Sequence, residues 1–198
     1  ITTRNGVMQT LTYYAGTDRV HEVLDPSGRA LNFAYDANGR IQTITLPGGK
    51  TLTYAYDSRG RLSTVTYPDE TASTTDNPKR RYLYELTGAR QLLLTGIEDE
   101  NGTRLATYAY HGDGRIQSTQ RAGGAGLKSF TYAAGSPTVT DAASVSRAHT
   151  LETMRGVVKA SAVDGLPASD CLTESTADYD ANGYRDQATD FNGNVTDY

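Results

Sequence analysis

The sequence predicts an all-β protein made of consecutive antiparallel β-hairpins. A turn that follows a tyrosine recurs along the chain, apolar residues alternate with polar or small ones before that turn, and Pro and Gly mark the reversals between units. In all four copies of the turn, a Gly lies four residues after the Tyr. Units this short must stack on their neighbours to bury an apolar face, so we expect one continuous architecture.

The two clearest units, residues 28–44 and 49–65, superimpose with a shift of 21 residues. In residues 31–35 and 52–56, every second residue is Leu, Phe or Tyr, and the residues between them are Asn, Thr or Ala. This period of two predicts a half-buried strand before each turn.

The strand after each turn is less regular. Ile41 and Ile44 are three residues apart, and so are Leu62 and Val65. A flat strand would place the two members of each pair on opposite faces. Either a β-bulge or burial on both faces would explain this spacing.

The turn itself has a clear chemical pattern. An Asp at its first position and a Gly at its end predict a type I turn followed by a glycine at positive φ. Copies depart from the pattern at His111 and Tyr184, and no turn glycine follows in place after residues 84–85 and 132–133. The residues that define the repeats are Tyr35, Asp36, Gly39, Arg40, Tyr56, Asp57, Gly60, Arg61, Tyr110, Gly114, Arg115, Tyr179, Asp180 and Gly183.

Together, the repeated Y-D-x-x-G-R turn and the P-x-G reversals resemble the Rhs/YD-repeat family of bacterial polymorphic toxins, toxin-complex shells and teneurins. The resemblance implies a curved, spiralling sheet that is part of a larger hollow β-shell. We expect residues 1–198 to form a single block of such repeats. The clearest repeats are 24–45, 46–67, 96–120 and 178–198, and the divergent ones, with loops, are 68–95 and 121–177.

The two ends of the sequence suggest a piece of a longer chain. Aligning Gly193 with Gly49 makes Tyr198 the counterpart of Tyr54, so the next repeat tyrosine is expected two residues beyond the end. No apolar run approaches the roughly 20 residues of a membrane-spanning helix. We therefore expect no membrane span.

Charge does not favour a nucleic-acid partner. The formal net charge is -4, and acidic and basic residues are interspersed. The densest basic run, residues 79–81, is expected to be a solvated strand edge. Residues 69–78 and 161–169 are expected to be loops, residues 123–126 a hairpin tip, and residues 142–163 either helix or strand.

One segment matches the opening of a calcium-binding loop. Asp178, Asp180 and Asn182 have the required spacing, but Thr189 stands where such a loop needs a bidentate carboxylate. The same D-x-N-G segment forms the repeat turn at residues 36–39, so we expect a structural turn and no bound metal.

No catalytic or cofactor site is expected either, and the chain is predicted not to be an enzyme. His21, His111 and His149 have no metal-ligand spacing, and the sequence marks no orienting partner for a Cys171–His149 nucleophile pair. The Asp25-Pro26-Ser27-Gly28 segment resembles the Asp-Pro-x-Gly cleavage element of Rhs relatives, but it occupies a routine hairpin reversal.

What the resemblance implies for function is a non-catalytic wall segment of a shell that encapsulates, and helps to deliver, a C-terminal toxin. The implied partners are the flanking repeats, the toxin cargo of the same parent chain, and secretion-machine or chaperone proteins. The implied location is secreted, delivered by a bacterial secretion system, or at the cell surface, after synthesis in the cytoplasm. The alternative is a carbohydrate-binding or cell-surface adhesion module whose glycan would stack on Tyr54, Tyr56, Tyr108 and Tyr110.

Overall fold

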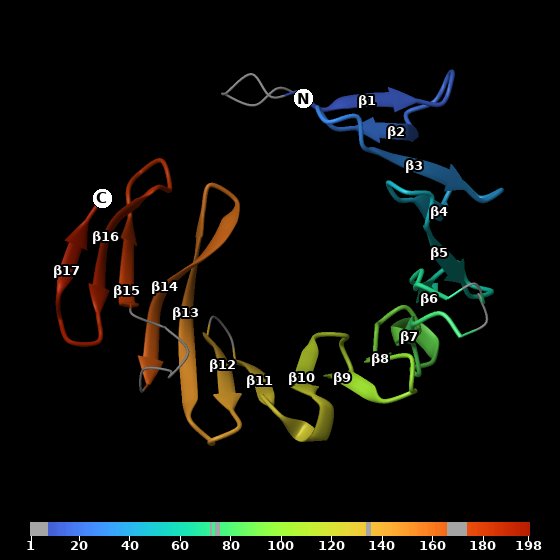
Figure 1. The fold of residues 1–198 in the computed structure, drawn as a ribbon. Coiled ribbons are helices and arrows are strands. Elements are labelled where there is room, and N and C mark those ends of the chain that lie inside the picture. The colour runs from blue at the N-terminus through green and yellow to red at the C-terminus, as the bar shows by residue number, and fades with distance from the viewer. Residues whose placement is uncertain (1–7, 72, 74–75, 134–135, 166–173) are drawn as a thin grey trace. The chain divides into compact units, whose positions relative to one another are not determined.

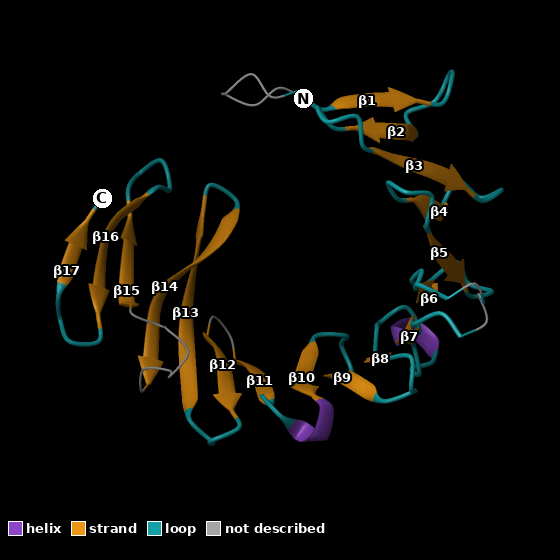
Figure 2. Cartoon of the chain, viewed as in Figure 1, coloured by secondary structure: helices purple, strands orange, loops and turns teal. Residues whose placement is uncertain are grey.

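The computed structural model describes residues 8–71, 73, 76–133, 136–165 and 174–198. Nearly all regular structure is β-strand, with two short 3₁₀ helices (Figure 2). The chain divides into two compact units, residues 1–105 and 106–198. In each unit, strands that follow one another in the chain lie side by side, as the colour gradient of Figure 1 shows. The predicted all-β hairpin architecture is confirmed.

The first unit is an antiparallel meander in which each strand from β1 to β7 pairs with the next one. The 3₁₀ helix η1 (Gly88–Arg90) connects its last two strands. The strands are β1 (Thr10–Tyr13), β2 (Val20–Leu24), β3 (Ala30–Tyr35), β4 (Ile41–Thr45), β5 (Thr51–Tyr56), β6 (Leu62–Thr66), β7 (Lys79–Leu83) and β8 (Gly96–Glu98).

The second unit continues the same pattern after β9 (Arg104–Tyr110), the strand in which the division between the units falls. Each strand from β9 to β16 pairs antiparallel with the next. The remaining elements are β10 (Ile116–Arg121), η2 (Ala122–Gly124), β11 (Lys128–Ala133), β12 (Ser136–Asp141), β13 (Ser146–Met154), β14 (Val157–Gly165), β15 (Glu174–Tyr179), β16 (Arg185–Asp190) and β17 (Val195–Asp197).

Three expectations about local structure are settled here. Within residues 142–163, left open between helix and strand, β13 covers 146–154 and β14 begins at Val157. The loop predicted over 161–169 is wrong for residues 161–165, because β14 runs to Gly165 and pairs with β13 there. The prediction that residues 79–81 form a strand edge is also wrong, because β7 is flanked by both β6 and β8.

The hairpin turns share one backbone geometry. In the turn after β3, the Asp36 N–H donates to the Arg40 carbonyl at 2.8 Å, the Gly39 N–H donates to the Asp36 carbonyl at 2.9 Å, and Gly39 has a φ of 79°. This confirms the predicted turn with a glycine at positive φ. The same pair of hydrogen bonds closes the turns that begin at Asp25, Leu46, Asp57, Asp99, His111, Asp141, Asp180 and Asp190.

β-Bulges explain the three-residue spacing after each turn. Tyr35 faces Ile41 and Ala34 faces Thr43, so Gln42 is the extra residue of β4. Equivalent shifts leave one extra residue in β6, β10 and β16. The bulge returns the following apolar residue to the face of the preceding one, so burial on both faces is not needed to explain the pattern.

Strands β3 to β6 have two chemically different faces, as their register shows. We call them the apolar face and the threonine face. The apolar face carries Leu31, Phe33, Tyr35, Ile41, Ile44, Leu52, Tyr54, Tyr56, Leu62 and Val65. The threonine face carries Ala30, Asn32, Ala34, Thr43, Thr45, Thr51, Thr53, Ala55, Thr64 and Thr66.

The core is thin. Among the described residues, the buried apolar side chains are Val65, Ala177 and Ala188, and each keeps a few per cent of its surface exposed. All other members of the apolar face are half-buried. Since so little apolar surface leaves water completely, links between neighbouring strands must supply much of the stability. None of the helices in the described part of the chain has the length and apolar character needed to cross a membrane.

We predict that Gly39→Ala destabilises the chain more than Gly28→Ala does. Both glycines have a φ near 80°, so each alanine pays about 1–2 kcal/mol for a left-handed backbone. A Cβ at position 39 would also clash with the Arg19 guanidinium unless that side chain moves, whereas position 28 has open space. Urea unfolding of both variants measures the difference, and equal losses would show that Arg19 moves aside without cost.

Candidate functional site

The repeat turn holds an arginine through an aspartate. Asp36 Oδ1 accepts the backbone N–H groups of Asn38 and Arg40, each at 2.9 Å. Its other oxygen, Oδ2, accepts Nε and Nη2 of the Arg40 side chain at 2.8 and 2.7 Å. One carboxylate therefore closes the turn and fixes the direction of the guanidinium, and this bidentate geometry is specific to arginine.

The same clamp is present in two further turns. Asp57 accepts the Arg61 N–H at 3.0 Å and Arg61 Nε at 2.6 Å. Asp25, in the segment that resembles a cleavage element, accepts the Arg29 N–H at 2.9 Å and Arg29 Nε at 2.6 Å. In this structure Asp25 acts as a turn residue, as predicted.

The clamped arginine reaches the tyrosine of the next unit. Arg40 Cζ lies 4.2 Å from the ring centroid of Tyr56, within the range of a cation–π contact. Arg61 lies 4.4 Å from the Tyr84 ring centroid. The other such contacts are Arg19 with Tyr35, Arg115 with Tyr132, Lys159 with Tyr179 and Arg185 with Tyr198.

Three of these tyrosines are also tied to an earlier strand by their hydroxyl groups. Tyr56 O–H donates to the Ile41 carbonyl at 2.8 Å, and Tyr35 O–H donates to the Val20 carbonyl at 2.9 Å. Tyr179 O–H donates to the Ala160 carbonyl at 2.9 Å. We call the recurring set of turn carboxylate, cation and next tyrosine the Asp–Arg–Tyr ladder.

Two tyrosines whose turns depart from the repeat pattern also have an arginine stacked on their rings. Tyr84 and Tyr132 lack a turn glycine in place, yet Arg61 and Arg115 stack on them. For Tyr132 the spacing of arginine and tyrosine could have shown this, since Arg40 precedes Tyr56 by 16 residues and Arg115 precedes Tyr132 by 17. Arg61 precedes Tyr84 by 23 residues, so that spacing does not lead to Tyr84.

Glu85, the residue after Tyr84, uses its carboxylate in a different way. It accepts Arg104 Nη1 at 3.0 Å and Nη2 at 2.7 Å. Thr95 O–H donates to the same carboxylate at 2.8 Å, and Arg104 Nη2 also donates to the Thr95 carbonyl at 2.9 Å. Thr95 is fully buried, so this group of residues closes the long connection between β7 and β8.

An aromatic residue replaces the turn aspartate in two hairpins. Tyr14 O–H donates to the Phe33 carbonyl at 2.8 Å, and the Nε2 of His111 lies 3.0 Å from the Phe130 carbonyl. Each ring meets the ladder tyrosine of the next unit edge-on, with centroids 5.9 Å apart for Tyr14 and 5.8 Å for His111. His111 is thus more than a surface turn residue, because it links its own hairpin directly to the next one.

The turn at His111 also keeps an acidic partner for its arginine. Asp113, two residues further along, accepts Arg115 Nε and Nη2, both at 2.7 Å. Gly114 keeps the positive φ of the regular turn, and Tyr110 before it is half-buried. Asp113 therefore holds Arg115 in place of the aspartate that His111 replaces.

The last YD turn differs because Tyr184 occupies the arginine position and is 73% exposed. Asp180 Oδ1 still accepts the Asn182 and Tyr184 N–H groups at 2.9 and 2.8 Å. Cations come from the β13–β14 hairpin instead: Arg155 Nε donates to the Ala181 carbonyl at 2.9 Å, and Lys159 donates to the Gly183 carbonyl.

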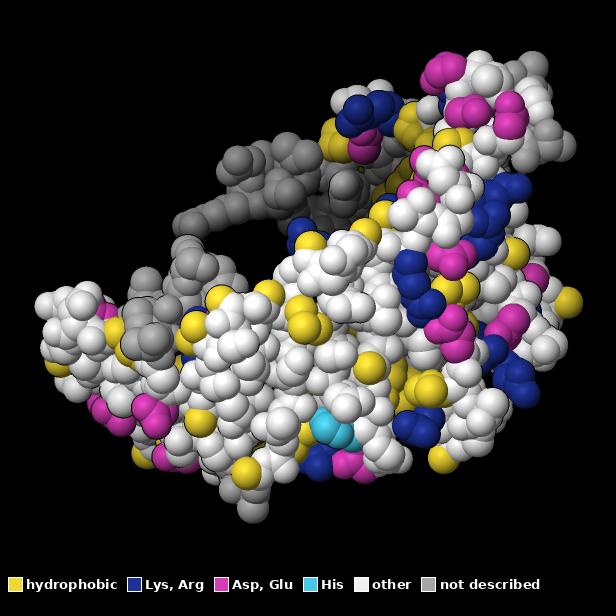
Figure 3. Space-filling model, turned by 90° about the horizontal axis from the view of Figure 1, so that it is seen from below, with side chains coloured by type: hydrophobic (Ala, Val, Ile, Leu, Met, Phe, Trp, Pro, Cys, Tyr) yellow, Lys and Arg dark blue, Asp and Glu magenta, His cyan; other side chains and the backbone are white. Residues whose placement is uncertain are grey.

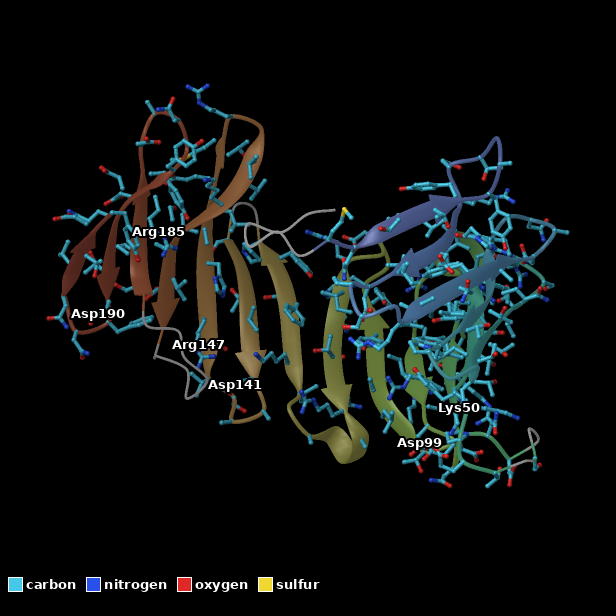
Figure 4. All side chains as sticks on the ribbon, turned by 45° about the horizontal axis from the view of Figure 1, so that its top comes forward. Lys50, Asp99, Asp141, Arg147, Arg185 and Asp190 are labelled. Atoms are coloured by element: carbon cyan, nitrogen blue, oxygen red, sulfur yellow. The ribbon has the colours of Figure 1, made fainter. Side chains whose placement is uncertain are left out.

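Two turns outside the YD copies have related clamps. Asp141 and the fully buried Arg147 lie side by side, with an oxygen–nitrogen distance of 3.3 Å (Figure 4). Asp190 accepts the Asn194 side-chain amide at 2.7 Å, so an asparagine stands in for arginine there. On the molecular face in Figure 3, basic and acidic side chains are interspersed.

The clamps depress the pKa values of the turn carboxyls. Hydrogen bonds from the Arg40 N–H and side chain hold the pKa of Asp36 below its usual 3.8. The Arg61 side chain does the same for the pKa of Asp57. Burial raises the pKa values of Tyr56, Tyr84 and Tyr110.

The remaining candidate chemistry is sparse in the described residues. No group of three or more His, Cys, Asp or Glu side chains there could hold a metal ion. Cys171 lies outside the described residues. Tyr54, Tyr56, Tyr108 and Tyr110, considered for glycan stacking, are all half-buried, and the Tyr56 ring already carries Arg40.

Comparison with known families identifies the repeat to which these turns belong. The RHS Repeat family model matches residues 14–51 and 35–72, which contain the turns at Asp36 and Asp57. Residues 14–72 of this chain are Rhs repeats. No curated protein matches the chain.

Two solved structures that this chain resembles are distant from it in sequence. The crystal structure of TcdB2-TccC3-TEV is 15% identical, and the match covers 96% of this chain and 15% of that chain, with a TM-score of 0.35. The Photorhabdus luminescens Tc holotoxin pore is 13% identical over 98% of this chain and 15% of that one, with a TM-score of 0.36. This chain thus spans about 15% of the length of these solved chains.

We predict that Arg40→Ala costs about 0.5–1 kcal/mol more free energy of unfolding than Arg29→Ala. Both arginines form the bidentate pair with their turn aspartate. Arg40 also stacks on Tyr56, whereas the Arg29 side chain is 71% exposed. Denaturant unfolding measures the difference, and equal costs would mean that the cation–π contact contributes nothing.

A second prediction concerns acid. Because the folded-state pKa of Asp57 is lowered, its contribution to stability is full above pH 3.8 and is lost as pH falls through the lowered value. We expect Asp57→Asn to flatten the fall in stability between about pH 5 and about pH 2. Asp76→Asn, in an exposed loop, is the control and should leave the slope unchanged. An identical pH profile for Asp57→Asn and the unsubstituted chain would contradict the prediction.

Proposed function

We propose that residues 1–198 form a single block of wall in an Rhs shell that encloses a C-terminal toxic polypeptide and helps to deliver it. The observation that carries the proposal is the Asp–Arg–Tyr ladder, which joins neighbouring hairpins at the cation–π contacts described above. In these links the repeat residues hold neighbouring hairpins together, so their role is structural.

A wall made this way needs no second layer. The ladder works between neighbouring hairpins, so units can be added without a thick core, and closure along a spiral hides strand edges. The near absence of fully buried apolar side chains among the described residues fits such a single layer. The same residues that would serve an enzyme, the carboxylates and cations, are used in turn clamps.

The proposal also specifies partners and location. The flanking repeats and the cargo of the same parent chain are the direct partners, and secretion-machine or chaperone proteins are the external ones. A bacterial secretion system would carry the shell out of the cell after synthesis in the cytoplasm. No activity of its own is required of the wall.

Limited proteolysis of the full-length parent tests the proposal, with mass spectrometry following the segment downstream of Tyr198. We expect that segment to resist protease in the native protein and to be digested once mild denaturant opens the repeats. Digestion of the segment in the native protein, at the rate seen after denaturation, would overturn the proposal.

Ladder variants make the test specific. The double variant Arg40→Ala/Arg61→Ala should lower the denaturant concentration at which protection is lost, because it removes two links between units. Arg29→Ala is the matched control, since it removes the same kind of turn clamp at an exposed side chain. Equal shifts for both would show that protection does not depend on the ladder.

A further inference from the structure

The fourth copy of the repeat, around Tyr179, lacks apolar bulk at positions where the clearest copies have it. With the repeat tyrosines aligned, Ser175 and Ala177 of β15 take positions that hold a Leu and an aromatic residue in both β3 and β5. The first position after the turn is apolar in the three other copies but is Arg185 in this one; the apolar residues are Ile41, Leu62 and Ile116. Small side chains and one cation therefore replace large apolar side chains.

Strand register places these residues on one face of the sheet. Cross-strand partners share a face, and neighbours along a strand point to opposite faces. Ala162 of β14 faces Thr176 of β15, so the residues on either side of each point to the other face. The pairs between β13 and β16 extend that other face, which carries His149, Ser161, Ser175, Ala177, Tyr179 and Arg185.

The missing bulk leaves a hollow where β14 and β15 separate. Among the described residues, these two strands pair at the single position Ala162–Thr176. The hollow has a volume of about 260 Å³, and its lining includes all six residues of the face just described. Sites for drug-sized ligands are larger, at about 300–1,000 Å³. The space therefore suits a ligand of only a few heavy atoms.

The charged and polar groups around the hollow favour an anion. The described residues that line it include Arg185 but no Asp or Glu. Arg185 lies at the start of β16 and is half-buried (Figure 4). His149 and Ser161 are also half-buried, and no hydrogen bond joins either side chain to a described residue. An imidazole and a hydroxyl in this state keep their hydrogen-bonding capacity for a ligand.

We propose that this hollow binds a small organic carboxylate. The two oxygens of a carboxylate match the planar fork of an arginine such as Arg185. The His149 ring and the Ser161 hydroxyl supply further donors on the same face. Val163 and Ala177 offer apolar contact to a short aliphatic part, which a purely inorganic anion lacks. The site is independent of the proposed shell function.

Equilibrium dialysis of the full-length parent against radiolabelled butyrate tests the site, because butyrate is a carboxylate on a short aliphatic chain. Arg185→Leu removes the cation and introduces a residue that a regular copy has at this position. Ser161→Leu fills the hollow and leaves the cation in place. Arg121→Gln, at an exposed arginine outside the hollow, is the control. Circular dichroism checks that each variant is folded.

We expect Arg185→Leu and Ser161→Leu each to weaken butyrate binding by about tenfold or more, and Arg121→Gln to leave it unchanged. If Arg185→Leu does not fold, Ser161→Leu decides the outcome. Absence of binding, or equal binding by the folded variants and the unsubstituted chain, would overturn the site. Stronger displacement of the label by inorganic phosphate than by unlabelled butyrate would overturn the carboxylate assignment.

Discussion

The stacking of an arginine from one hairpin on a tyrosine of the next is the interaction on which the rest of this structure depends. A single-layer sheet with few buried side chains cannot gain its stability from a thick core. Arg40 shows how the chain meets this constraint: its guanidinium is held by Asp36 on one side and covers Tyr56 on the other. Arg40 thereby connects its own turn to the neighbouring hairpin.

The ladder tolerates substitution because its parts are physically exchangeable. Where His111 takes the place of aspartate, Asp113 supplies the carboxylate and the imidazole makes the contact to the next unit. Where Tyr184 takes the place of arginine, the next residue, Arg185, lies 5.5 Å from the ring centroid of Tyr198. The repeat sequence at His111 and Tyr184 therefore departs from the common pattern while links between neighbouring hairpins remain.

The separation of the two faces adds a second level of organisation to this design. The β-bulges after the turns keep residues such as Ile41 and Ile44 on the side of Tyr35, so the apolar face remains continuous from strand to strand. The same sheet therefore has one face of threonine and one of aliphatic and aromatic side chains.

The sequence by itself determined the local features: the hairpins, the positive φ at Gly39 and Gly60, and the alternation of faces, since each depends on residues within one turn or strand. It left open whether the spacing of Ile41 and Ile44 meant a bulge, and register with β3 decided this. Only the tertiary structure showed that Tyr84 takes part in the ladder. Its partner Arg61 is 23 residues earlier, and nothing in the local pattern brings the two together until the strands between them pair.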